Sequence, residues 1–306
     1  AWLTDRLINE GLRKIQVSGF GVWNNIVEGK INADIVILGS SRALTHYDPR
    51  IIQQLTGRTA YNIGLNGSQT DMQVARFKTY LQHNKKPTLL IFNLDLFSFQ
   101  VTHGGAYDTG QYLPYLNETD LYTALERINP EWWKSKSIPL YGYAVEDLRF
   151  TWILGATSWL KSNSVEDHFL GFKPRATQWT GDFERFKAMN PNGIHFDIEP
   201  EGLNQMEELL QLCQQLGIKV VLVYSPEYKE IQTLTNNRSL IFAKFDELSK
   251  QFRAPVWDYS ASLISSRKEY FYNSQHLNAD GAHQFSLDLA AKLVTDPGMA
   301  KFLASH

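Results

Sequence analysis

The sequence holds one cysteine, Cys213, among its 306 residues. A single cysteine cannot form a disulfide within the chain, so cysteine pairing says nothing about the compartment. Cys213 follows Leu203, Met206 and Leu210 at helical spacing, which predicts a buried position on a helix. A chain of this length can bury a large core, so it needs no cross-link to fold.

Net charge is also nearly absent, because 30 lysines and arginines face 32 acidic residues and leave −2. Such a chain has no long-range field for a polyanion, so we expect no nucleic-acid partner. The sequence has no Gly-x-Gly-x-x-Gly turn either, which argues against a dinucleotide, and we expect no cofactor and no metal.

Long apolar runs are missing as well, since no stretch approaches the roughly 18–20 residues of a membrane span. The chain begins at Ala1 without methionine and continues directly into Trp2 and Leu3. We expect a chain trimmed behind a signal or anchor. This predicts an extracytoplasmic protein, periplasmic or on the cell surface, tethered to a membrane through a missing N-terminal segment.

Short apolar runs recur along the chain and predict strands near 34–39, 59–63, 88–94, 218–224 and 254–258. The runs are continuous, which favours strands buried on both faces of a parallel sheet. Helical patterns fill the gaps, and Asn278 is placed to cap a last helix. Alternating strands and helices predict a doubly wound parallel α/β fold with five strands.

The interval 97–200 breaks this alternation. Five of the eight tryptophans lie in it, at positions 132, 133, 152, 159 and 179. The interval is too long for a plain loop, and we expect helices around 119–127 and 145–161. We therefore predict a single domain, 1–306, with 97–200 as an inserted helical subdomain over the carboxyl edge of the sheet. Its aromatic residues would form a small core of their own or line a sugar-binding cleft.

Ligands of open parallel sheets bind beyond the carboxyl ends of the strands, so the residues after each strand matter most. Ser41 follows the first strand and would begin a helix, whose amides and dipole favour developing negative charge. Gly67 lies in the second turn, where its amide can reach an oxyanion. His276 follows the last strand and can take the serine proton. These groups suffice for acyl transfer.

Gly39-Ser40-Ser41-Arg42, then Tyr61-Asn62-Ile63-Gly64 with Gly67, then His276-Leu277-Asn278 with Gly281 resemble the SGNH (GDSL-like) hydrolase superfamily. The similarity is greatest to the branch with Gly-Ser-Ser in its first block, which includes proteins of cell-envelope polysaccharide acylation, such as alginate acetylation and teichoic acid D-alanylation. The resemblance implies a flavodoxin-like fold, Ser41 as nucleophile, His276 as base, and an oxyanion hole from the amides of Ser41 and Gly67.

Two blocks depart from the superfamily pattern. The third block usually supplies an oxyanion-hole asparagine, and here Asn93, Asp95 or neither fills that place. Asn273 stands where the superfamily usually has the aspartate that orients the histidine. In serine proteases the change of that aspartate to asparagine lowers turnover about 10⁴-fold. Backbone carbonyls, or Asp258 at the end of the last strand, are other groups that would orient His276.

Each pattern also has a plainer explanation. Ser41 would serve as a capping residue of an ordinary turn, and His276 as a polar residue flanking a helix. His195, Asp197 and Glu199 alternate, as metal ligands on one face of a strand would, but a solvated edge strand fits better. His46 is expected to be structural or to lie on the substrate side.

Two functions follow from these patterns. The first is a serine esterase or acyltransferase that removes or moves a small acyl group, with an acylated carbohydrate or small ester as its substrate. The second is a catalytically weakened protein that keeps the pocket to bind a glycan or a partner. Asn273 favours the second function, whereas Ser41, Gly67 and His276 favour the first.

Overall fold

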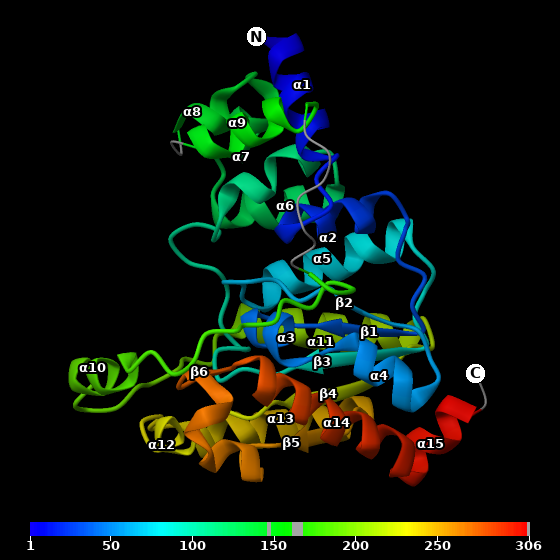
Figure 1. Cartoon of the computed structure of the whole chain (residues 1–306), viewed down its shortest axis with the longest axis vertical. Coiled ribbons are helices and arrows are strands. Elements are labelled where there is room, and N and C mark those ends of the chain that lie inside the picture. Colours follow the sequence, from blue (N-terminus) through cyan, green and yellow to red (C-terminus); the bar gives the residue numbers. More distant parts are fainter. Residues whose placement is uncertain (146–147, 161–167, 305–306) are drawn as a thin grey trace.

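The computed structural model describes residues 1–145, 148–160 and 168–304. Its centre is a parallel sheet in the order β2-β1-β3-β4-β5 (Figure 1). The strands are β1 (Ile35–Leu38), β2 (Ala60–Asn62), β3 (Leu89–Asn93), β4 (Lys219–Tyr224) and β5 (Val256–Asp258). The predicted five-stranded, doubly wound α/β fold is therefore confirmed.

The strand β1 pairs with β2 on one side and with β3 on the other, so the strand order reverses beside it. At such a switch point the connecting chains leave toward opposite faces, and a crevice opens at the carboxyl ends of the strands. Ser41 follows β1 directly at this place. The topology therefore positions the predicted nucleophile where sheets of this kind bind ligands.

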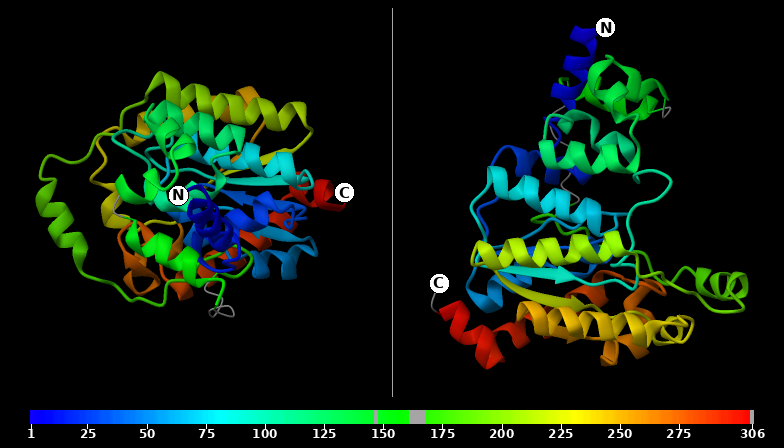
Figure 2. Two further views of the ribbon diagram at one scale, coloured as in Figure 1. Left: turned by 90° about the horizontal axis from the view of Figure 1, so that it is seen from above. Right: turned by 180° about the vertical axis from the view of Figure 1, so that it is seen from behind.

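Strand side chains alternate between two apolar clusters because successive residues of a strand point to opposite faces. Val36 and Leu38 face one cluster, and Ile35 and Ile37 face the other. Helices cover both faces (Figures 1 and 2). The first face carries α2 (Ser18–Val27), α5 (Thr70–His83), α11 (Pro200–Gln215) and α13 (Arg238–Phe252), and the second α4 (Pro49–Thr56), α14 (Ala279–Thr295) and α15 (Pro297–Ala304).

Two local predictions on these helices are confirmed. The Asn278 side chain caps α14 by accepting a hydrogen bond from the Gly281 amide at 3.0 Å. Cys213 lies buried on α11, and burial raises the pKa of its thiol to about 12. In the part of the chain that the structure describes, no helix is both long enough and apolar enough to cross a membrane.

The insert is helical, but most of it does not lie over the carboxyl edge as predicted. Its helices rise in a stack above α5, with α1 (Trp2–Leu12) packed against α9 (Figure 1). Leu121 and Leu125 belong to the same apolar cluster as Phe77 of α5. Removal of these side chains from water therefore favours packing of the insert on this face. The stack consists of α6 (Thr119–Ile128), α7 (Trp132–Ser137), α8 (Tyr141–Val145) and α9 (Arg149–Thr157).

The aromatic residues of the insert divide between core and surface. Trp132 is buried, whereas Trp133, Trp152 and Trp159 are exposed. Tyr115 stacks on Trp23 of α2 with ring centroids 5.6 Å apart. The insert therefore shares the main core and does not form a separate one. Part of the predicted helix 145–161 lies outside the described residues.

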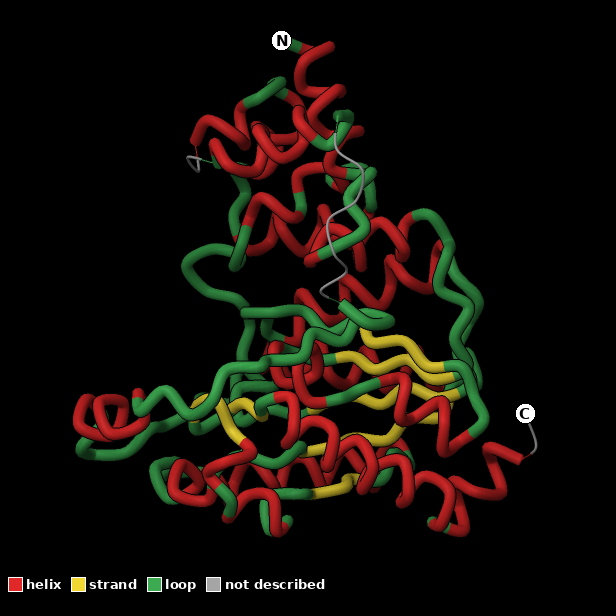
Figure 3. Tube along the Cα trace, in the orientation of Figure 1, coloured by secondary structure: helices red, strands yellow, loops and turns green. Residues whose placement is uncertain are grey.

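The returning segment, 168–199, is the part of the insert that crosses the carboxyl edge. It is mostly loop, with α10 (Asp182–Met189) projecting from the body (Figures 1 and 3). Gly171 approaches β2 so closely that a Cβ there would lie 1.8 Å from the Asn62 carbonyl oxygen. The Lys173 amide donates to the Leu44 carbonyl, and the Ala279 amide donates to the Arg175 carbonyl. This segment thus borders the turn that carries Ser41.

Candidate active site

The turn after β1 is shaped by Gly39 and Ser40. Gly39 has φ of +146°, and a Cβ there would lie 2.8 Å from Cβ of Asn93, so only glycine fits. The Ser40 hydroxyl caps α3 (Ser41–His46) by accepting from the Arg42 amide at 3.2 Å. Ser41 is consequently the first residue of a helix, where backbone amides have no partner within the helix.

The structure brings Ser41 and His276 together. Ser41 Oγ lies 2.8 Å from His276 Nε2, although the two residues are 235 positions apart in the chain. His276 begins the short strand β7 (His276–Leu277), which pairs with β6 (Phe271–Asn273) before α14 begins. This distance is within the range for direct proton transfer from a nucleophile to its base.

Asn273 sets the tautomer of His276. Asn273 Oδ1 accepts hydrogen bonds from the backbone amides of Gln275 and His276, at 3.0 and 2.9 Å. Amides can only donate, so the side-chain atom at this place is the oxygen. The same oxygen lies 3.0 Å from His276 Nδ1, which must then carry the proton. Nε2 is left with its lone pair toward the Ser41 hydroxyl, as a general base requires.

The charges around His276 favour its neutral form. Burial, together with the positive charges of Arg42 and Arg175, lowers the pKa of His276 to about 3. Asn273 orients the ring but adds no negative charge that would stabilise the imidazolium. His276 is therefore neutral over the whole physiological range of pH, and a histidine with so low a pKa would be a weak base.

The Ser41 and Gly67 amides are the two donors that the sequence predicted for an oxyanion hole. Gly67 has φ of +63°, and a Cβ there would lie 2.4 Å from Cγ of Tyr107. Within the described residues, neither the Gly67 amide nor the Ser41 amide donates to a protein acceptor outside helices. Amides without a protein acceptor are the kind of donor that a tetrahedral oxyanion needs, so this part of the prediction stays open to both residues. Tyr107, which the sequence did not point to, is half exposed and covers Gly67.

The structure does not bring Asn93 and Asp95 into this hole. Asn93 Oδ1 accepts from the Tyr47 hydroxyl at 2.7 Å, and its Nδ2 donates toward Asp95 Oδ2 at 3.3 Å. Asp95 is buried and pairs with Arg42 Nη1 at 3.3 Å. Both side chains are therefore engaged behind the turn, where they hold Arg42 in place, and neither donates to an oxyanion.

Asp258 does not approach His276. It lies exposed at the end of β5, where its carboxylate accepts from the Ser260 amide at 2.8 Å. His195, Asp197 and Glu199 lie on a loop and not on the predicted edge strand, and Glu199 pairs with His103 at 3.0 Å. Among the residues of known placement, no group of histidine, cysteine and acidic side chains is arranged to hold a metal.

His46 has a structural role that its sequence position only hinted at. Its Nδ1 lies 2.9 Å from Ser225 Oγ, and its Nε2 accepts from the Leu277 amide at 3.0 Å. The ring is fully buried, and burial lowers its pKa well below the usual value. Arg42 and His46 are four residues apart and share one face of α3, which was the available signal for this buried network.

Tyr272 and Arg175 complete the surroundings of the base. The Tyr272 ring stacks on the His276 ring, with centroids 5.3 Å apart and an interplanar angle of 21°. The Arg175 guanidinium lies 5.7 Å from the centroid of Tyr272. No sequence pattern pointed to Arg175, because it lies in the insert, outside all the motifs.

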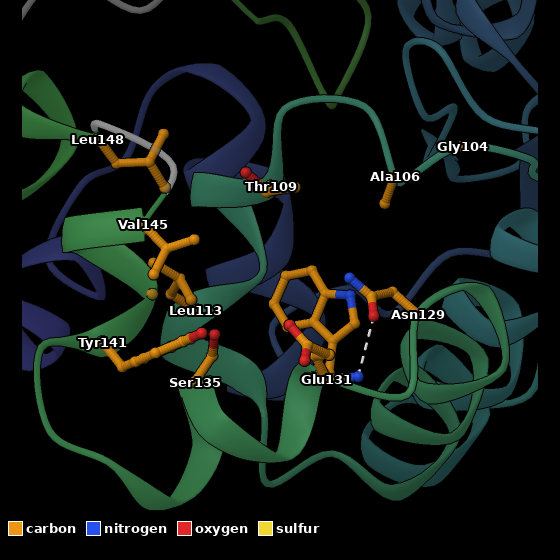
Figure 4. Close-up of a pocket in the computed structure, with 13 residues that line it drawn as sticks. Gly104, Ala106, Thr109, Leu113, Asn129, Glu131, Ser135, Tyr141, Val145 and Leu148 are labelled. Carbon is orange, nitrogen blue, oxygen red and sulfur yellow. Dashed lines mark hydrogen bonds between the residues drawn. The ribbon is translucent and has the colours of Figure 1, made fainter.

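A separate cavity lies inside the insert. It has a volume of about 240 Å³ between the loop 104–109 and the helices α7 and α8 (Figure 4). Ser135 and Tyr141 face it, and Trp132 lies at its wall. It holds no histidine and one acidic residue, Glu131. The lining of the cavity therefore offers Ser135 no histidine of the kind that Ser41 contacts.

No family model matches the sequence, and no curated protein matches it. Among solved structures, a GDSL-like lipase from Bacteroides thetaiotaomicron is 10% identical, with a TM-score of 0.41, over 91% of this chain and 99% of the other. A family two carbohydrate esterase from Clostridium thermocellum, solved with cellohexaose, is 11% identical, with a TM-score of 0.26, over 87% of this chain and 64% of the other.

The first of these neighbours carries the name of the superfamily that the sequence motifs predicted. The Gly-Ser-Ser branch of that superfamily stays a prediction. At such identities and TM-scores, neither neighbour assigns an activity to this chain.

Proposed function

We propose that this protein is a serine esterase or acyltransferase that works through an acyl-enzyme on Ser41. The observation that carries the proposal is the relay from Asn273 Oδ1 through His276 to Ser41 Oγ, with distances of 3.0 and 2.8 Å. A serine at a helix start, a histidine of fixed tautomer and backbone amides without a protein acceptor are the parts of an acyl-transfer site.

In the first half-reaction, Ser41 Oγ attacks the ester carbonyl carbon while His276 Nε2 takes the hydroxyl proton. The amides of Ser41 and Gly67 donate to the oxyanion that forms. The tetrahedral intermediate then breaks its bond to the leaving oxygen, which receives the proton from Nε2. The products are an acyl-Ser41 ester and a free alcohol.

In the second half-reaction, water or another hydroxyl attacks acyl-Ser41 as Nε2 again takes the proton. Breakdown returns that proton to Ser41 Oγ. Water gives hydrolysis, and a sugar hydroxyl gives acyl transfer. Both outcomes use the same residues.

The proposal extends to small acyl groups on a carbohydrate, including a cell-envelope glycan, and to a protein outside the cytoplasm. Support comes from the motif resemblance of Gly39-Ser40-Ser41 and from the Tyr107 ring, which is 54% exposed beside Gly67. Exposed aromatic rings next to a nucleophile suit the apolar face of a sugar.

A second candidate is a binding protein with the same crevice and little turnover. The neutral Asn273 supports it, because the imidazolium that both half-reactions form receives no opposite charge from this residue. The two candidates differ in whether Ser41 becomes acylated.

The test is to mix the protein with p-nitrophenyl acetate and, separately, with a fluorophosphonate probe. We expect ester hydrolysis and covalent labelling, both lost in Ser41→Ala and kept in Ser266→Ala, a matched change at an exposed serine. Labelling that persists in Ser41→Ala would exclude Ser41 as the nucleophile. If the wild type shows no turnover and no labelling, the result would favour the binding protein.

A further inference from the structure

Arg175 is a cation beside the catalytic base that no part of the proposed reaction uses. It lies on the loop of the returning segment, and its backbone is fixed by the hydrogen bond from the Ala279 amide to its carbonyl at 2.8 Å. That bond joins it to the first residue of α14, just after the strand that carries His276. The guanidinium is thus held near the site by the fold itself.

The hydrogen-bonding capacity of this guanidinium is only partly used by the protein, through its interaction with the Tyr272 side chain. Its Nε is buried and has no hydrogen-bond partner. Among the described residues, no carboxylate lies within ion-pairing distance of Arg175, whereas the buried Arg42 has Asp95 and Arg238 has Glu227. An arginine fork without an acidic partner is free to bind a planar or tetrahedral anion in a bidentate manner.

The Tyr272 ring connects this cation to the base. Its centroid lies 5.7 Å from the Arg175 guanidinium carbon and 5.3 Å from the centroid of the His276 ring. His276 Nε2 must deliver its proton to the leaving oxygen, so the alcohol part of a substrate lies on the histidine side of Ser41. Arg175 contacts Tyr272, the ring that stacks on His276, so it is associated with the histidine side as well.

We propose that Arg175, with the Tyr272 ring, forms a subsite for an anionic group, a carboxylate or a phosphate, on the alcohol part of the substrate. The inference rests on the ester cleavage proposed above. It narrows the substrate class from esters in general to esters of acidic alcohols, such as an acylated acidic sugar.

The subsite also compensates for the missing aspartate. His276 is faced by the cation Arg42 and the ring of His46 from α3, by Tyr272 from β6 and by Arg175 from the loop. Among these neighbours of His276, Asn273 adds no negative charge. An anion on Arg175 would neutralise one of the two cations that oppose the imidazolium, so the substrate itself would supply charge that the protein lacks.

The experiment compares esters that differ in charge: 4-acetoxybenzamide, which is neutral, with 4-acetoxybenzoate and 4-acetoxyphenyl phosphate. For Arg175→Gln we expect kcat/KM on the anionic esters to fall about 10- to 100-fold, which is the contribution of one charge-assisted hydrogen bond. On the neutral amide we expect kcat/KM to change little. The two anionic esters distinguish a carboxylate subsite from a phosphate subsite.

Arg175→Lys keeps the charge but not the fork, so it should recover part of the loss. Arg267→Gln removes an exposed arginine that lies over Tyr270, and it should leave all three rates unchanged. On the neutral amide, Arg175→Gln should also move the acid limb of kcat/KM to higher pH, because one cation near His276 is gone. A merely structural role for Arg175 would produce neither the charge selectivity nor this shift.

An equal loss on charged and neutral esters would overturn the subsite while leaving the proposed function intact. If the wild type cleaves none of the esters, the proposed function fails. The existence of the anion subsite is then tested by measuring ligand binding. Calorimetry on Ser41→Ala should show tighter binding of 4-hydroxybenzoate than of 4-hydroxybenzamide, with the difference lost after Arg175→Gln. Equal binding of the two ligands would overturn the subsite independently of turnover.

Discussion

His46 Nε2 accepts a hydrogen bond from the Leu277 amide at 3.0 Å, and this bond joins the first catalytic turn to the last. The same ring contacts Ser225 Oγ through Nδ1, which ties the pair to the end of β4. Leu277 follows His276 directly, so the hydrogen bond fixes the backbone next to His276. Three segments that are distant in the sequence are thereby held together at the site.

The His46→Leu change is expected to leave the buried Leu277 amide without an acceptor. The free energy of unfolding should fall by about 1–3 kcal/mol, the cost of an unsatisfied buried polar group. Urea denaturation measures this loss, and the rate of fluorophosphonate labelling measures the displacement of His276. Ser225→Ala keeps the Leu277 bond and serves as the control. Labelling at the wild-type rate in His46→Leu would show that this bond does not position the base.

Asn273→Asp is expected to raise both turnover and the pKa of His276. The carboxylate would accept the same three N–H groups and add the charge that stabilises the imidazolium. The reverse change costs serine proteases about 10⁴-fold in turnover, so a gain of about tenfold or more in kcat is a modest expectation. The measurement is kcat/KM on a short-chain ester across pH.

Asp258→Ala is the control for that experiment, because Asp258 is bonded to Ser260 and should not affect the rate. An unchanged rate and an unchanged acid limb in Asn273→Asp would contradict the role assigned to Asn273. Asn273→Ala should lower the rate, since Nδ1 would lose the acceptor that fixes its proton.

The wild-type enzyme should keep its activity in acid. Catalysis needs neutral His276, and a pKa lowered to about 3 leaves the ring neutral well below the ordinary value near 6.5. Values of kcat/KM from initial rates should therefore stay constant from neutral pH to about pH 4, because His276 remains neutral over this range. An acid limb centred near pH 6.5 would show that the site leaves the basicity of His276 unperturbed.

Stability, in contrast to activity, should change over this range. The unfolded chain takes up a proton at His276 near pH 6.5, whereas the folded chain does so only near pH 3. Protonation then favours unfolding, so the free energy of unfolding should decline as pH falls through this window. Circular dichroism at each pH separates this loss of structure from a loss of activity.

Gly67→Ala is expected to damage the oxyanion hole. The added Cβ would lie 2.4 Å from Cγ of Tyr107, and φ of +63° is unfavourable for alanine. Removing one oxyanion donor elsewhere costs about 10²–10³-fold in kcat, which sets the scale of the expected loss. The double change with Tyr107→Ala removes the collision and should restore part of kcat. No restoration would mean that the backbone conformation, and not the tyrosine, limits the site.

The sequence predicted the strands, their parallel arrangement and the pairing of Ser41 with His276, because continuous apolar runs and short motifs are local signals. It did not predict that Asn93 and Asp95 are buried behind the turn, since that depends on Tyr47, Ser225 and Arg42 from other segments. The position of the insert was also missed. Leu121 and Leu125 show that α6 is amphipathic, but amphipathic spacing does not say which face of the sheet a helix will cover.

The 235 positions between Ser41 and His276 have a consequence for synthesis of the protein. A growing chain exposes its nucleophile early, on a helix start formed by local residues, but its base emerges from the ribosome near the end. The base reaches the serine when α14 packs against α3 and α4 and closes that side of the core. On the proposed function, completion of the fold and onset of reactivity would be one event, and an unfinished or truncated chain would carry a serine that cannot attack esters.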